Sequence, residues 1–334
     1  MVVLVQRLSK IYFKLENHFH HHHEAEAAAA EEEALQASLK AFRSDVSIGL
    51  NRLLSNSKPG SSEFISFSWI QQCFELLPVI NKAFAKMVME IDCPMRKWEA
   101  SSVEEYLNYS LSLMELLNSI SSSISHLGHA RLSLSHALSL VENSPSMAIE
   151  RLRGGFHTKS SIKEKFTRPK KNKVEDGGEE EEAEEDGFCS KKVKVVDVAL
   201  MELKSIGFWV CGVILAGLSG DAKAYMEMRE SEGGYSNSAL KSLDSVICEV
   251  IMEEEKRGVL KDVRELNDSA NCLAAASETG KGDSSEQAEE LKRRLEVFEM
   301  VLDNLGKEVD HLFSKLLAGR NELIDGIRRN IRTE

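Results

Sequence analysis

The stretch IGFWVCGVILAGL, residues 206–218, is the most apolar run in the chain. It continues a pattern of apolar residues three and four positions apart that begins near residue 192, which is typical of one face of a helix. These 13 residues extend only about 20 Å as a helix, whereas the hydrocarbon core of a bilayer is roughly 30 Å thick. Small residues at Gly212, Ala216 and Gly220 form a stripe that allows a second helix to approach closely.

We therefore interpret this segment as the central helix of a soluble bundle, with a membrane-inserted or re-entrant segment as the alternative. Lys204 and Asp221 flank the run closely. The candidate residues for helix packing or membrane contact are Ile206, Phe208, Trp209, Val210, Gly212, Ile214, Leu215, Ala216 and Leu218.

Helical periodicity also dominates the rest of the chain. Apolar residues step by three and four over 35–53, and they repeat every seven residues over 63–91, 103–141 and 291–323. The sequence Ser101–Glu105 offers a capping box for the third of these helices, which would be about 60 Å long. Together with only 5 prolines and 6% aromatic residues, these patterns predict an all-α fold in which long antiparallel helices form a bundle.

A charge-segregated stretch interrupts the helical pattern after residue 153. The first half of this stretch is basic, and the second half, from residue 175 to 186, is acidic. Blocks of like charge stay solvated, so we predict a disordered linker over 154–192. Its basic half is a candidate docking cluster for a charged partner or an anionic membrane, formed by Lys159, Lys163, Lys165, Arg168, Lys170, Lys171 and Lys173.

The linker divides the chain into two helical blocks. The first block covers 35–153 and the second covers 193–334. Both expose wide apolar faces, so we expect them to pack together in a shared bundle. Residues 1–34 combine a short basic amphipathic helix with a low-complexity His/Ala/Glu tract. That helix could pack on the body, touch an anionic membrane or begin a transit peptide.

The sequence contains few groups that suggest chemistry. The formal net charge of −12 argues against nucleic acid as the main partner. The 6 cysteines are scattered without a CxxC pair, as in proteins of a reducing compartment. Glu308 and His311 match one Glu-x-x-His element of helical di-iron sites, which need two. We therefore expect no catalytic residue, no metal and no cofactor.

Five stretches closely resemble the plant BYPASS family, which groups with the wider ROH-like helical proteins. They are SWIQQCFELLPVINKAF (68–84), WEASSVEEYLNYSLSLMELLNSISSSISHLGHARLSLSHALSLVE (98–142), SIGFWVCGVILAGLSGD (205–221), VRELND (263–268) and EVDHLFSKLLAGRNELIDGIR (308–328). This resemblance implies a non-enzymatic plant protein that restrains a root-derived mobile signal during root and shoot development. It carries no catalytic residues over to this chain.

Two alternatives remain beside a regulator that binds other proteins through helical surfaces. The first is a membrane-peripheral trafficking factor, since ROH-like relatives are linked to the exocyst. The second is an enzyme that acts on the precursor of the mobile signal. We expect a cytoplasmic or membrane-associated protein, with the plastid as the alternative location, and the oligomeric state stays open.

Overall fold

The computed structural model describes residues 29–55, 65–155, 187–232, 235–254, 258–279 and 284–331. Within these ranges all regular structure is helical, which confirms the all-α class predicted from the apolar periodicity. Residues 1–28 and the basic cluster at 159–173 lie outside the described ranges.

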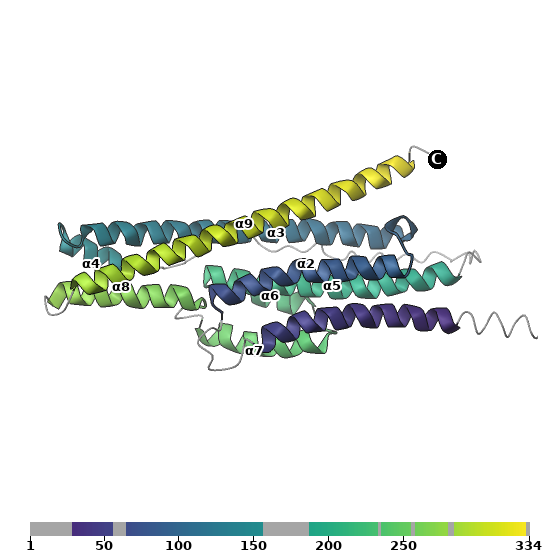
Figure 1. Cartoon of the computed structure of the whole chain (residues 1–334), viewed down its shortest axis with the longest axis horizontal. Coiled ribbons are helices and arrows are strands. Elements are labelled where there is room, and N and C mark those ends of the chain that lie inside the picture. Colours follow the sequence, from purple (N-terminus) through teal and green to yellow (C-terminus); the bar gives the residue numbers. More distant parts are fainter. Residues whose placement is uncertain are drawn as a thin grey trace, which may run out of the picture.

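The described helices form one elongated bundle. After the helix at residues 29–55, the elements are α2 (Phe67–Glu90), η1 (Met95–Lys97), α3 (Ala100–Leu140), α4 (Pro145–Gly154), α5 (Gly187–Ser219), α6 (Lys223–Glu232), α7 (Ser238–Glu254), α8 (Lys261–Thr279) and α9 (Ser284–Ile331). Figure 1 shows that most of them run along the long axis, while α9 crosses α3 obliquely and diverges toward its C-terminal end. The sequence-predicted bundle of long helices is therefore present.

The start of α3 differs from the prediction. The helix begins at Ala100 after Glu99, and no side chain caps it, so the capping box expected at residues 101–105 is wrong. Ser102 lies in the first turn, where its hydroxyl donates a hydrogen bond of 2.6 Å to the carboxylate of Asp197 in α5. A contact between helices has thus replaced the local cap.

Helix α5 occupies the centre of the bundle. Every residue from Ile206 to Leu218 is buried, and α5 packs against α2, α3, α6 and α7. The apolar core contains residues from before and after the charged linker, including Leu117 of α3 and Phe298 of α9. A single core therefore holds both halves of the chain together.

Three glycines let the neighbours of α5 come close. A Cβ atom at Gly207 would lie 2.5 Å from the Tyr109 hydroxyl of α3, and one at Gly212 would lie 2.7 Å from the Met228 methyl of α6. At Gly217 the nearest atom would be Ile70 of α2, 3.2 Å away. Because residues five apart differ by about 140° around a helix, the glycines serve three different faces.

Gly220 does not belong to a stripe of small residues, contrary to the sequence-based expectation. Helix α5 ends at Ser219, and Gly220 follows with a φ of 68°. Its backbone N–H donates to the carbonyl of Ala216 at 3.0 Å. Left-handed backbone after a helix favours glycine, so this residue terminates α5.

The close approach at Gly207 predicts a large cost for one added methyl group. We expect Gly207→Ala to lower the free energy of unfolding by about 1–3 kcal/mol, as overpacking typically does, measured by urea denaturation. Adding Tyr109→Phe should recover part of the loss. In the control Gly306→Ala, the new Cβ meets nothing within 4 Å, so stability should rise by about 0.5–1 kcal/mol. Equal losses for both alanine variants would contradict this packing.

Candidate functional site

The polar side chains of α5 connect it to its neighbours. Glu202 is only 6% exposed, and its Oε1 accepts from the Nε of Arg43 at 2.7 Å. Lys204 pairs with Glu105 of α3, close to the bond between Ser102 and Asp197. A buried charge is costly without a partner, so these pairs favour one orientation of α5 in the bundle.

A buried carboxylate joins α5, α6 and α7. Asp244 of α7 is 4% exposed, and its Oδ1 accepts from the Trp209 indole at 2.9 Å and from the Tyr225 hydroxyl at 2.5 Å. Its Oδ2 accepts from Arg229 Nε at 2.8 Å. Burial, followed by the bond to Asp244, raises the pKa of the Tyr225 hydroxyl, which therefore remains a donor.

Sequence reasoning missed this cluster. An indole N–H inside an apolar helix needs an acceptor, so Trp209 is a signal that some polar group must lie nearby. The spacing of Asp244 from Trp209 along the chain gives no indication that these two residues meet. The fold of α6 and α7 back onto α5 makes the contact.

Polar contacts also fasten α9 to the bundle. Arg131 of α3 pairs with Glu299, and Arg320 donates to the Ser110 hydroxyl at 2.7 Å. Glu308 accepts from Gln71 of α2 at 2.9 Å, while His311 is exposed. The Glu-x-x-His element thus contributes a contact between helices through Glu308. In the described ranges no group of three His, Cys, Asp or Glu residues is placed to hold a metal ion.

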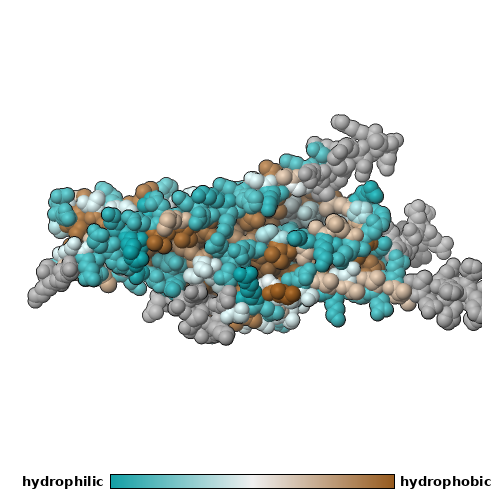
Figure 2. Space-filling view, in the orientation of Figure 1, coloured by the Kyte–Doolittle hydropathy of each residue, from teal (hydrophilic) through white to brown (hydrophobic). Residues whose placement is uncertain are grey.

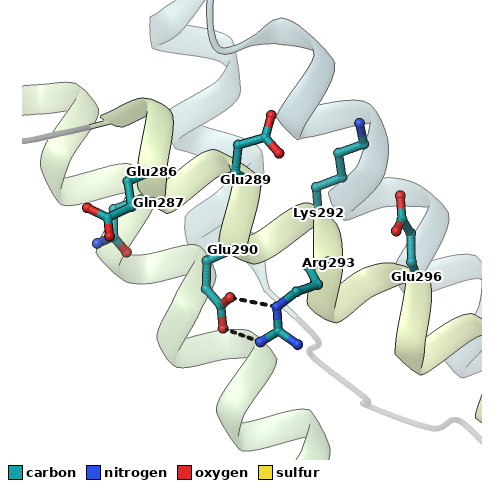
Figure 3. Close-up of a pocket in the computed structure, with 7 residues that line it drawn as sticks. All are labelled: Glu286, Gln287, Glu289, Glu290, Lys292, Arg293 and Glu296. Atoms are coloured by element: carbon teal, nitrogen blue, oxygen red, sulfur yellow. Dashed lines mark hydrogen bonds and ion pairs between the residues drawn. The ribbon is translucent and has the colours of Figure 1, made fainter.

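Two depressions mark the surface of α9. The larger, about 580 Å³, is lined by residues Glu286 to Glu296 of α9 alone. Figure 3 shows their side chains spreading apart, except that Glu290 and Arg293 bond each other. Hydrogen bonds from Arg293 and Arg294 lower the pKa of Glu290 to about 2. Glu290 and Arg293 are paired with each other, and the charged side chains that line this depression do not converge on a common point.

The second depression, about 410 Å³, lies between α3 and α9. Arg131 and Leu138 line one side, and Leu295 and Glu299 line the other. Figure 2 shows a mostly hydrophilic face with apolar residues in several separate groups. Ligand pockets in proteins usually enclose convergent polar groups within apolar walls, and both depressions differ from that pattern.

The candidate segment 206–218 lies in a helix with the length and composition of a membrane span. The span covers Lys191–Ser219, with a mean hydropathy of 1.8 over its most apolar window. It exceeds the predicted 13 residues because Val193, Val196 and Leu200 extend the apolar sequence backwards. In this fold 72% of that window is buried inside the protein.

No disulfide joins the five cysteines whose side chains the structure describes. Cys73, Cys93 and Cys211 are buried, Cys248 is half-buried and Cys272 is exposed. Burial raises the pKa of the Cys73 thiol, so it remains protonated and packs as a small apolar group.

The fold and these contacts define an all-helical bundle protein with an enclosed apolar helix. Its sequence is similar to "Protein BPS1, chloroplastic" of Arabidopsis thaliana, with 25% identity over 312 residues, which cover 87% of this chain and 83% of that protein. "UPF0496 protein 4" of Oryza sativa subsp. japonica is 23% identical over 292 residues, and its indica counterpart is 23% identical over 245 residues. These similarities confirm the resemblance to the plant BYPASS family.

The coverage differs between these relatives. The match spans 62% of the japonica protein and 53% of the indica protein, so those proteins are considerably longer than the shared region. No protein-family model matches the chain, and no solved structure matches it.

The contact between Arg43 and Glu202 predicts a non-additive pair of substitutions. Arg43→Met leaves a buried carboxylate unpaired and should lower the free energy of unfolding by about 2–3 kcal/mol, somewhat less than for fully buried pairs because Arg43 is half exposed. The double variant with Glu202→Met should stay within about 1 kcal/mol of the original protein. Chemical denaturation of all four proteins measures the coupling, and strictly additive losses would rule out this role.

Proposed function

We propose that this chain is a non-enzymatic regulator of plant development that resembles BYPASS proteins. It restrains a root-derived mobile signal, is needed for normal root and shoot development, and acts by binding other proteins through its helical surfaces. The observation that carries the proposal is the similarity to the Arabidopsis protein, which covers 87% of this chain and includes both helical blocks.

The physical character of the bundle supports binding as the mode of action. The buried carboxylates of Glu202 and Asp244 are engaged in contacts between helices. The long helices α3 and α9, of 41 and 48 residues, offer extended outer faces with charged and polar side chains. Such faces suit partner recognition through many modest contacts better than they suit a reaction centre.

The location belongs to the same proposal. The Arabidopsis relative carries the word "chloroplastic" in its name, which supports the plastid over the cytoplasm. The span-length helix α5 supports membrane association. Imaging of the full chain with a C-terminal fluorescent protein distinguishes these locations.

A second candidate function is a membrane-peripheral trafficking factor linked to the exocyst. Helix α5 favours it through its length and hydropathy. In the closed bundle, however, α5 packs against α2 and α3, so the closed form offers a membrane only its outer surface. Carbonate extraction of plant membranes should therefore release most of the protein.

The third possibility, an enzyme on the precursor of the mobile signal, makes a distinct prediction. The purified protein would be incubated with root extract from plants that lack this chain. An enzyme would change the concentrations of specific small molecules in that extract. A metabolite profile that responds to added protein would favour the enzyme over the regulator.

Grafting tests the regulatory role directly. When roots that lack this chain carry a normal shoot, we expect shoot growth to arrest, because the mobile signal is no longer restrained. Expression of the chain in the root alone should restore growth. The control graft, a shoot lacking the chain on a normal root, should grow normally. Normal growth of shoots on the deficient roots would refute the proposal.

A further inference from the structure

The outer face of helix α3 lacks charged side chains over its C-terminal half. Residues 116–141 contain one residue with a formal charge, Arg131, and it pairs with Glu299 on the side of α3 that meets α9. In the whole chain, 29% of residues are charged. A helix face in contact with water usually carries charged residues, so this half of α3 has the composition of a covered surface.

We call this surface the neutral face and define it by the residues of α3 between positions 118 and 139 that are exposed in the bundle. They are Asn118, Ser122, Ser125, His126, His129, Leu132, Ser133, His136 and Ser139. The face is about 33 Å long, at 1.5 Å per residue. Figure 1 shows that this half of α3, from its crossing with α9 to α4, forms the upper edge of the bundle.

Charged groups lie along the edges of the neutral face. Arg151 of α4 contacts the Nδ1 of His136 at 2.6 Å, and Lys292 and Glu296 of α9 lie across the smaller depression from Ser139. Interfaces between proteins have the same distribution, with few charged residues at the centre and polar groups around the rim.

The chemistry of the neutral face fits a second copy of the same chain. In a two-fold dimer the same surface meets itself, so each kind of group must be able to pair with its own kind. Serine hydroxyls, the asparagine amide and neutral imidazoles each contain a donor and an acceptor, whereas a carboxylate only accepts and an ammonium group only donates. A charged partner would lose the hydration of its ions here without gaining a counter-ion.

We propose that the neutral face is the surface through which two copies of this chain associate. The net charge of −12 on each copy makes them repel each other, and the side chains of the neutral face add nothing to that repulsion. A strip of about 33 by 10 Å is smaller than the roughly 800 Å² per partner of a standard interface, so the dimer is weak and reversible. This inference goes beyond the proposed regulatory function and does not depend on it.

Sedimentation velocity of the full chain tests the association. At about pH 8, where imidazole is uncharged, we expect the mean mass to rise from one chain toward two as the concentration increases from about 5 to 500 µM. Raising NaCl from about 0.1 to 0.5 M should strengthen association roughly threefold, because salt screens the repulsion between the net charges. A chain that stays monomeric throughout, or whose association weakens with salt as at ion-paired interfaces, would overturn the proposal.

Two matched double variants locate the interface. Ser122→Glu with His129→Glu adds two carboxylates, seven residues apart, to the neutral face. Asn304→Glu with His311→Glu adds the same pair at the same spacing to exposed positions of α9, so both variants change the net charge equally. We expect the first variant to weaken association at least tenfold and the second to change it less than twofold. Equal effects of the two variants would show that the neutral face is not the interface.

Cross-linking provides a second measurement that adds no charge. In a background with Cys189→Ser, Cys248→Ser and Cys272→Ser, the remaining cysteines are buried. A cysteine introduced by His129→Cys then lies on the neutral face, and one introduced by Asn304→Cys lies on α9. A short bismaleimide should join two copies at least tenfold faster through position 129 than through position 304. Similar rates at both positions would reflect random collisions and would overturn the proposal.

Discussion

The constraint on which the structure depends is that residues 206–218 of α5 must be covered on all sides. A helix with apolar residues around its whole circumference cannot remain at a protein surface in water. The bundle meets this requirement with α2, α3, α6 and α7. Glycines at 207, 212 and 217 turn three faces of α5 toward three different helices. The remaining helices complete the bundle around this packed centre.

Ion pairs and hydrogen bonds fix the orientation of α5, which the burial of apolar side chains alone does not fix. Apolar contact alone would allow α5 to rotate or slide, since one leucine surface resembles another. Asp197 and Lys204 pair with α3, and Glu202 pairs with the helix at 29–55. One orientation of α5 satisfies all three pairs. Asp244 extends the same principle to α6 and α7. The buried charges therefore contribute to a unique arrangement more than to total stability.

The same architecture bears on the proposed function. Helix α5 packs against α2, α3, α6 and α7, and α9 packs against α3 and α8. The faces of α3 and α9 that point away from these contacts are available for partners. A protein built this way can offer binding surfaces in its closed form. Its apolar helix α5 lies beneath α6 and α7, which attach to it through Asp244 and through buried apolar residues such as Leu243 and Ile247. The similarity to BPS1 of Arabidopsis is the basis of the proposed regulatory function.

The sequence by itself determined the all-α class, the long helices and the apolar character of 206–218, because periodicity reports which faces of a helix avoid water. Only the tertiary structure decided which helices surround α5, that Trp209 meets Asp244, and that Gly220 ends a helix. It also replaced the predicted cap of α3 with a bond from Ser102 to Asp197. These outcomes depend on contacts between residues far apart in the chain, and a local sequence pattern does not indicate which distant residues will be in contact.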